Sequence, residues 1–454
     1  MNLTLFTNAL ARHSRSLCRL LCLCMCLASA ASAAEFLSLT ADQPTHVYRC
    51  GAPVKITVVV SNEVAPLTGR QLRCVYQADG APGQVTTNTA GEGLLLLTLK
   101  APAIPGWGLL SVHLLNDKGR ETLKRSLGVL SEPEAIRPGA PDPDDFDAFW
   151  AAQIAAMNAT PMEPLIQPVT NAAAGMRILD VRLSCGAPVP PFTNAPANYA
   201  YLYMGMPTDA SPRSLPAIVQ FQGASTIGLG AHPGRMWYAD CAIHVRMSPH
   251  SARNNWTPEE DKEFRALLAG WGYALMNADS RENYYMRGMI LRVVRTLQFV
   301  KQQPEWDGKV LFLHGESQGG FQSLVGAALD PDASFCLAMV PAMSDHLGFR
   351  LGRRNGWPNV IRNSEGGRPA DAFGTAAARV LPYYDNANFA RRIKCETWIA
   401  TGLLDAVCPP SSVCAVFNAL PSETQRDLYL DPKAGHGTCN PAVLPRLEAL
   451  LGKQ

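Results

Sequence analysis

Residues 309–321 read KVLFLHGESQGGF, and this stretch decides the fold. The apolar run 310–313 predicts a buried β-strand, and the pattern at 320–329 predicts a helix that starts soon after it. Gly315 and Gly319 leave the chain between these two elements free to turn sharply. A strand that runs through a tight turn into a helix is a unit of an α/β fold with a mainly parallel sheet.

The same alternation of strand and helix continues on both sides of this stretch. Apolar runs at 217–221, 273–276 and 397–401 are each followed by a nearby Gly or Asn, and a helical pattern lies at 289–302. We therefore predict a mainly parallel sheet with helices on both faces. In such sheets, ligands bind where the parallel strands have their carboxyl ends.

Ser317 lies at the centre of a Gly-x-Ser-x-Gly motif, between the predicted strand and the predicted helix. A serine nucleophile at such a turn is strained and tolerates no bulky neighbours, and Gly315 and Gly319 meet this demand. The start of the helix also offers backbone N–H groups, among them that of Gln318, to a negatively charged oxygen. This is the pattern of a nucleophile elbow, and it predicts the α/β-hydrolase fold.

A serine nucleophile needs a general base and an acid that orients the base, and in this fold the acid precedes the histidine in the chain. Asp405 follows the apolar run 397–401, and His436 lies between two glycines after the predicted strand 427–430. Each has an ordinary alternative, as a turn aspartate or a structural histidine. Their order and loop positions favour Ser317, Asp405 and His436 as a catalytic triad, which needs no metal or organic cofactor.

The oxyanion formed in acyl transfer is expected to bind two backbone N–H groups. One is that of Gln318, and we assign the second to Ala224, in the loop after the predicted strand 217–221. The alternative is that this loop is an ordinary connection. The other histidines after the first 33 residues lack the context of His436 and are expected to be structural, with His232 and His346 the strongest other candidates. They are His46, His113, His232, His244, His250, His314 and His346.

The first 33 residues have the composition of a cleaved export signal. Three arginines precede the apolar run 20–27, and small residues with an Ala-x-Ala pattern follow it. This order is typical of a secretory signal peptide, here residues 1–33, and it predicts a secreted or periplasmic protein. A membrane anchor is the alternative, but the apolar run is far shorter than the roughly 20 residues that span a bilayer.

The rest of the chain divides into two parts. Residues 36–131 contain β-branched and apolar runs separated by clusters of Gly, Pro, Asn and Asp, which predicts a small Ig-like β-sandwich. A proline-rich linker at 132–143 separates it from the α/β-hydrolase domain at 144–454. The sandwich shows no nucleophile motif, so we expect an accessory, structural or subunit-contacting role, with carbohydrate binding as the alternative.

Charge and cysteine content exclude several classes of function. The sequence has 40 Lys and Arg against 38 Asp and Glu, a net charge of +2, which provides no basic surface for nucleic acid or an anionic membrane. The part after the signal has no Cys-x-x-Cys pair of zinc-like spacing, although Cys50 and Cys74 could form a disulfide. A small neutral substrate therefore fits better than a polyanion.

Residues 140–452 resemble the acetyl xylan esterase and cephalosporin C deacetylase family, carbohydrate esterase family seven. The resemblance rests on DFDAFW at 145–150, YMRG at 285–288, GESQGG at 315–320, Asp405 with CPPSSV at 408–413, and Gly435 with His436. It implies an esterase that removes short acyl groups, chiefly acetyl, from sugar hydroxyls, as in acetylated xylan oligosaccharides. It leaves open whether the chain forms a homo-oligomer.

The sequence departs from the family pattern at two places. The family carries His-Gly-Tyr at the oxyanion loop, where this chain has Gln222, Gly223 and Ala224, and it carries Arg-Gly-Gln near 277–282, where this chain has none. The loop keeps its backbone N–H groups but lacks the aromatic ring, so the preference for acyl and leaving groups should differ. Two other functions fit parts of the pattern: a prolyl-oligopeptidase-like peptidase, and an exported glycan-binding protein without catalysis.

Overall fold

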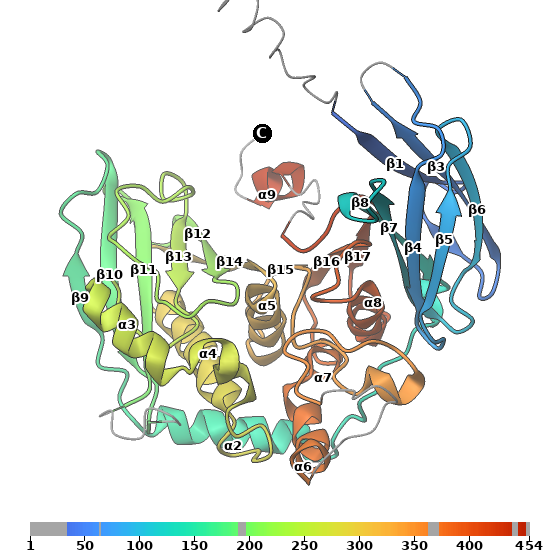
Figure 1. Ribbon diagram of the computed structural model, residues 1–454. Helices are drawn as coiled ribbons and strands as arrows, with labels where there is room; N and C mark the ends of the chain where they lie inside the picture. The colour runs from blue at the N-terminus through green and yellow to red at the C-terminus, as the bar shows by residue number, and fades with distance from the viewer. Residues whose placement is uncertain (1–33, 63–64, 189–196, 362–371, 438–443, 451–454) are drawn as a thin grey trace, which may run out of the picture.

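The computed structural model describes residues 34–62, 65–188, 197–361, 372–437 and 444–450. The predicted signal peptide, residues 1–33, lies outside these ranges. The described residues fold into two domains (Figure 1). One is built from the first eight strands, and the other is a large twisted sheet with helices.

The large sheet has nine strands in the order β17-β16-β15-β14-β12-β13-β11-β10-β9. From β13 through β12 to β17 all neighbours are parallel, whereas β11, β10 and β9 join antiparallel at the other end. This confirms the predicted α/β-hydrolase class with its mainly parallel sheet. The strands are β9 (Leu165–Pro168), β10 (Met176–Ser184), β11 (Tyr199–Pro207), β12 (Leu215–Phe221), β13 (Ile243–Met247), β14 (Trp306–Glu316), β15 (Phe335–Met339), β16 (Glu396–Gly402) and β17 (Arg426–Asp431).

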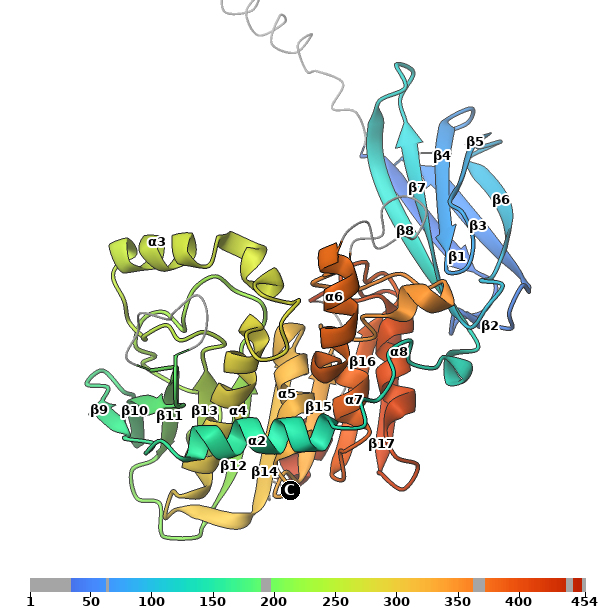
Figure 2. The same ribbon diagram turned by 90° about the horizontal axis from the view of Figure 1, so that it is seen from below.

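Most of the helices pack on one face of this sheet. Figure 2 shows α2 running across the outside of this helix layer, and in Figure 1 α9 lies on the opposite face. Val219 of β12 and Leu313 of β14 share one apolar core with Leu297 of α4, because apolar side chains recur on the inner face of each element. The helices are α2 (Phe146–Asn158), α3 (Pro258–Leu267), α4 (Tyr285–Lys301), α5 (Gln318–Leu329), α6 (Ala372–Val380), α7 (Asn386–Ala390), α8 (Pro410–Ala419) and α9 (Leu444–Leu450).

The first eight strands form two facing sheets, a three-stranded one in the order β1-β3-β6 and a five-stranded one in the order β2-β8-β7-β4-β5. Burial alternates residue by residue along β3 and β4, as expected where one face of each sheet meets the other. Cys50 and Cys74 are both free thiols, so the disulfide that the sequence allowed is not formed. The strands are β1 (Phe36–Ala41), β2 (Val47–Tyr48), β3 (Pro53–Ser61), β4 (Gln71–Ala78), β5 (Gln84–Thr89), β6 (Leu94–Lys100), β7 (Gly106–Leu115) and β8 (Glu121–Ser131).

The proline-rich segment after β8 packs against the large domain. It forms the short 3-10 helix η1 (Pro133–Ala135), and the side chain of Ile136 is fully buried in a cluster with Leu403. Asn418 of α8 donates hydrogen bonds from Nδ2 to the carbonyls of Pro133 and Ile136, at 2.7 and 2.8 Å. The segment predicted as a linker is therefore held along the surface of α8.

One predicted strand is wrong. Residues 273–276 were expected to be a strand, but they lie in and just after the 3-10 helix η2 (Gly270–Leu275). A short apolar run cannot be assigned to strand or buried helix by its periodicity, and here Tyr273 packs its ring against His250 and Tyr285. The strand between β12 and β11 is instead β13, in which apolar side chains alternate with His244 and Arg246.

The core of the large domain makes a testable stability prediction. Leu297→Ala should lower the free energy of unfolding by about 2–5 kcal/mol, because a fully buried leucine is replaced by a cavity. Urea unfolding followed by circular dichroism measures this change. Leu267→Ala is the control, since that leucine of α3 is 44% exposed and its loss should cost about 0.5 kcal/mol or less. Equal losses in the two variants would contradict the packing described.

Candidate active site

Ser317 occupies the sharp turn between β14 and α5. Its φ of 58° and ψ of −118° are strained for a residue with a side chain. A Cβ on Gly315 would lie 2.5 Å from the carbonyl carbon of Gly319, and a Cβ on Gly319 would lie 2.3 Å from the carbonyl oxygen of Phe221. Both positions of the motif therefore require glycine, as the sequence predicted.

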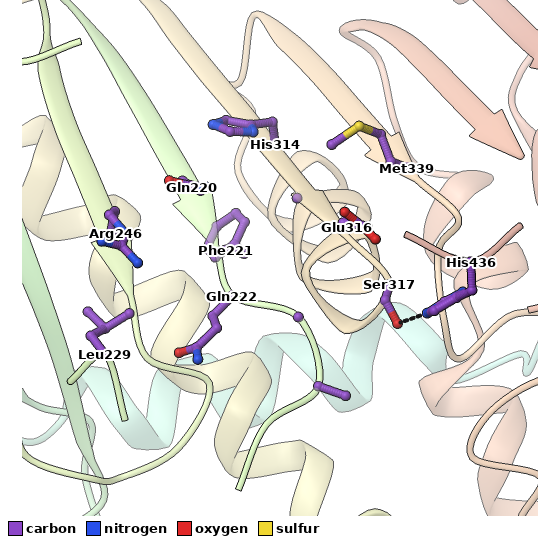
Figure 3. A pocket seen from close by; sticks show the side chains of 13 residues that line it. Gln220, Phe221, Gln222, Leu229, Arg246, His314, Glu316, Ser317, Met339 and His436 are labelled. Atoms are coloured by element: carbon purple, nitrogen blue, oxygen red, sulfur yellow. Dashed lines mark hydrogen bonds between the residues drawn. The ribbon is translucent and has the colours of Figure 1, made fainter. Parts of the chain in front are cut away.

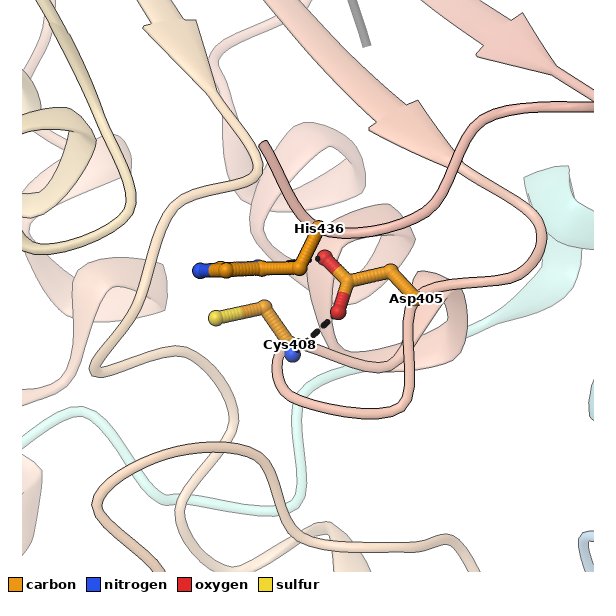
Figure 4. A group of neighbouring side chains, drawn as sticks. All are labelled: Asp405, Cys408 and His436. Atoms are coloured by element: carbon orange, nitrogen blue, oxygen red, sulfur yellow. Dashed lines mark hydrogen bonds and ion pairs between the residues drawn. The ribbon is translucent and has the colours of Figure 1, made fainter. Parts of the chain in front are cut away.

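Ser317, His436 and Asp405 come together at the carboxyl ends of β14, β16 and β17; Figure 3 shows Ser317 with His436, and Figure 4 shows His436 with Asp405. His436 Nε2 lies 3.0 Å from Ser317 Oγ, and His436 Nδ1 lies 2.9 Å from Asp405 Oδ2. Asp405 is fully buried, and its Oδ1 accepts the backbone N–H groups of Val407 and Cys408 at 2.8 and 2.9 Å. The structure thus brings the three predicted residues into one continuous hydrogen-bonded chain.

Two opposing effects set the pKa of His436. Partial burial disfavours the charged imidazolium, but the hydrogen bond and the negative charge of Asp405, aided by Glu316, outweigh it and raise the pKa above its ordinary value. The ring is therefore a stronger base than a free imidazole. It can take a proton from a hydroxyl at 3.0 Å and hold the resulting positive charge beside Asp405.

The loop after β12 lies beside Ser317, and polar side chains hold it in place. Gln322 of α5 donates from Nε2 to the carbonyl of Gln222 at 2.9 Å, and His250 Nε2 lies 2.7 Å from the carbonyl oxygen of Ser225. Gly223 and Ala224 line the same cavity as Ser317. Because both ends of this short loop are fixed, its backbone amides are held close to the serine.

The residue at the start of α5 is fixed as well. The phenol of Tyr273 donates a hydrogen bond to Gln318 Oε1 at 2.7 Å, and Gln322 Nε2 also donates to the Gln318 carbonyl at 3.1 Å. Sequence reasoning missed Tyr273, Gln322 and His250 as supports of the site. The spacing of Gln318 and Gln322, four residues apart on one helix, was a usable local signal, whereas nothing local marks His250.

A cavity of about 500 Å³ opens at Ser317 and His436 and extends along the loop after β12 (Figure 3). Its walls combine the apolar side chains of Phe221 and Leu229 with polar ones such as Gln222 and Arg246. Mixed walls of this kind suit a small ligand that has both apolar and hydroxyl-bearing parts.

Asp405, Cys408 and His436 also form a cluster of metal-ligating side chains, with their ligand atoms within 4.8 Å of one another (Figure 4). The donor set does not fit a metal well. Both oxygens of Asp405 already accept hydrogen bonds, and burial, followed by the charge of Asp405, raises the pKa of the Cys408 thiol well above its ordinary value. The cluster is better explained as an acid–base pair beside a neutral thiol.

The two other candidate histidines have different surroundings. His232 Nε2 lies 3.1 Å from Asp180 Oδ2, and neither His232 nor His346 lines the cavity at Ser317. Burial lowers the pKa of His346 to about 3, so it stays neutral. Their expected structural character fits these positions.

Comparison with solved structures shows the class of fold. An acetyl xylan esterase from Paenibacillus sp. R4 superimposes with a TM-score of 0.57 at 22% identity, covering 71% of this chain and 98% of that one. Acetyl xylan esterase 1 from Thermoanaerobacterium sp. JW/SL YS485 gives 0.55 at 20% identity, with the same coverage of both chains. At these identities the likeness shows the fold, which is that of the α/β-hydrolase esterases.

Sequence comparison then gives the family. The family model described as acetyl xylan esterase (AXE1) matches residues 127–444. Acetyl esterase Axe7A of Xylanibacter ruminicola is 31% identical over 343 residues, which are 74% of this chain and 72% of that protein. The chain belongs to the acetyl xylan esterase family and is a carboxylic ester hydrolase. This confirms the resemblance seen in the sequence, in preference to the peptidase and the non-catalytic binding protein.

The pairing of His436 with Asp405 makes a testable prediction about ionisation. Asp405→Asn should lower the pKa of His436 below that of the unmodified protein, because the partial burial stays while the carboxylate charge is lost. NMR titration of ¹⁵N-labelled histidine measures the change. Asp180→Asn is the matched control: it removes the carboxylate beside His232 and should leave the titration of His436 unchanged. An unchanged His436 pKa in Asp405→Asn would contradict the pairing.

Proposed function

We propose that Ser317, His436 and Asp405 form the catalytic triad of an esterase that removes short acyl groups, chiefly acetyl, from carbohydrate hydroxyls. The observation that carries the proposal is the unbroken chain of hydrogen bonds from Ser317 Oγ through His436 to Asp405. Membership of the acetyl xylan esterase family supports the reaction class. Acetylated xylan oligosaccharides are the substrate class that the relatives' names suggest.

Acylation follows from these contacts. His436 Nε2 takes the proton of Ser317 as Oγ attacks the ester carbonyl carbon, and the carbonyl electron pair moves onto oxygen. Asp405 accepts the Nδ1–H, which fixes the tautomer and stabilises the imidazolium. When the tetrahedral intermediate collapses, His436 returns the proton to the departing sugar oxygen, and the acyl group stays on Ser317.

Deacylation repeats these steps with water as the nucleophile. His436 removes a proton from a water molecule, the resulting hydroxide attacks the acyl carbonyl, and Ser317 Oγ leaves with the proton that His436 returns. In both halves we assign the oxyanion to the backbone N–H groups of Gln318 and Ala224. The fixed loop ends at Gln222 and Ser225 support this assignment, since preorganised donors need no rearrangement during the reaction.

We further propose that the protein is exported. Residues 1–33 have the order of charged, apolar and small residues that signal peptidases recognise. Among the residues that the structure describes, no helix combines the length and the hydrophobicity that crossing a membrane requires.

Replacement of the nucleophile tests the proposal directly. Ser317→Ala should lower kcat on 4-nitrophenyl acetate by roughly a thousandfold or more, because the remaining groups supply only binding and oxyanion contacts. Initial rates of the purified proteins give this ratio, with circular dichroism to show that the variant is folded. A folded variant that kept more than about a tenth of the wild-type kcat would mean that another residue attacks the ester.

A second test concerns the acyl group. The wild-type enzyme should cleave acetyl esters with a much higher kcat/KM than octanoyl esters of the same alcohol, because the cavity has polar as well as apolar walls. Rates on 4-nitrophenyl acetate and 4-nitrophenyl octanoate, with acetylated xylo-oligosaccharides as the carbohydrate substrate, measure the preference. A preference for the octanoyl ester would agree with an esterase but would contradict the proposed specificity for acetyl groups.

A further inference from the structure

The loop that carries Asp405 is in direct contact with the N-terminal sandwich. Trp107 of β7 is fully buried, and its Nε1–H donates to the carbonyl of Leu403 at 2.9 Å. Leu403 lies two residues before Asp405, on the turn that follows β16. A residue 296 positions earlier in the chain therefore binds the backbone that leads into the buried carboxylate.

Trp107 is itself held rigidly. Its backbone N–H donates to Asp79 Oδ2 at 2.8 Å, and its carbonyl accepts the N–H of Asp79 at 2.8 Å. The other oxygen of Asp79 accepts the backbone N–H of Arg354 at 3.0 Å, and the Arg354 guanidinium lies 5.0 Å from the centre of the indole ring. A fully buried indole with both backbone groups bonded and a cation over its face has little freedom to move.

A second strand of the sandwich, β8, also contacts the carbonyl group of Leu403. A Cβ on Gly128 of β8 would lie 1.9 Å from the oxygen of Leu403 and 2.6 Å from its carbonyl carbon. The backbones of β8 and of the turn are thus in contact with no side chain between them. Only glycine permits so close an approach.

The same turn is joined on its other side to the segment that carries His436. Leu403 N donates to the carbonyl of Asp431 at 2.8 Å, and Leu404 N donates to the carbonyl of Ala434 at 2.9 Å. Ala434 lies two residues before His436. The turn at Leu403 is therefore fixed between the sandwich and the histidine loop.

We propose that the N-terminal sandwich contributes to the geometry of the active site. Trp107 and Gly128 position the turn at Leu403, and this turn holds Asp405 within hydrogen-bonding distance of His436. They are positioning residues, since neither lines the cavity at Ser317. The inference rests on the proposed triad and goes beyond it. It replaces the expectation of an accessory module, because the contact falls on the backbone that carries the catalytic acid.

A purely structural contact would give a different result from a positioning contact. If the sandwich only stabilises the fold, damage to it lowers the melting temperature and leaves the chemistry unchanged below that temperature. If it positions Asp405, damage at the contact lowers kcat with KM nearly constant. It also moves the acid limb of the kcat/KM profile to lower pH. The reason is that a weaker Asp405 contact lowers the pKa of His436, while Glu316 is untouched.

The experiment compares two pairs of variants in the full chain. Trp107→Phe keeps an aromatic ring but removes the N–H that binds Leu403, and its control, Leu110→Ala, removes a fully buried side chain of the same strand from the sandwich core. Gly128→Ala pushes a methyl group against Leu403, and its control, Gly91→Ala, adds a methyl group where no atom lies within 4 Å. Each variant is checked by circular dichroism and thermal melting and is assayed well below its melting temperature.

We expect Trp107→Phe and Gly128→Ala to lower kcat by about threefold to tenfold with KM within about twofold of wild type. Hydrogen exchange of the amides at 403–408 should also become faster in both. Leu110→Ala should melt at a lower temperature without these changes, and Gly91→Ala should behave as wild type. Because exchange needs no catalysis, it tests the contact even if the triad assignment fails.

Two results would overturn the inference. In an active wild type, unchanged kcat, pH profile and exchange in folded Trp107→Phe and Gly128→Ala would show that the sandwich does not position the turn. Losses of kcat in Leu110→Ala as large as in Trp107→Phe would show that only general stability matters. A wild type no faster than Ser317→Ala would instead overturn the proposed triad, which is a separate outcome.

Discussion

The strained turn at Ser317 is the constraint on which the rest of the structure depends. Holding a residue with a side chain at a φ of 58° costs on the order of 1–3 kcal/mol, and such a conformation persists only where its surroundings enforce it. On one side Gly319 meets the end of β12 at Phe221, and on the other Ser317 N donates to the carbonyl of Met339 at 2.9 Å, at the end of β15. The neighbouring parallel strands thus fix the serine.

His436 lacks this kind of support on one side, because it follows β17, the last strand of the sheet. β17 is an edge strand, so the turn after it has a sheet neighbour, β16, on one side only. In Figure 1 the sandwich lies beside this end of the sheet. Trp107 and Leu403 share a small apolar cluster to which Leu428 and Leu430 of β17 contribute. The sandwich therefore supplies the support that a further strand would have given.

The contrast between local and distant contacts explains what the sequence could predict. The turn at Ser317 is encoded within five residues, and chain order then selected Asp405 and His436, which the structure brings within hydrogen-bonding distance. The prediction of a strand at 273–276 was wrong because an apolar run this short shows no periodicity that separates a strand from a buried helix. The contact of Trp107 with Leu403 had no signal at all, since a buried tryptophan on a strand is ordinary and its partner lies in another part of the chain.

Because the Asp405 carboxylate is buried, its hydrogen bonds depend on the position of the turn that carries it. A carboxylate removed from water is stable only if its oxygens are hydrogen-bonded. One oxygen here is bonded by the N–H groups of Val407 and Cys408, which belong to the same turn, and the other by His436. A shift of the turn therefore moves the carboxylate and its own solvating amides together, so those amides cannot resist it. Only groups outside the turn can do so: Trp107 of the sandwich binds its first residue, Leu403, and Trp357 N of the large domain donates to the carbonyl of Val407 at 2.8 Å.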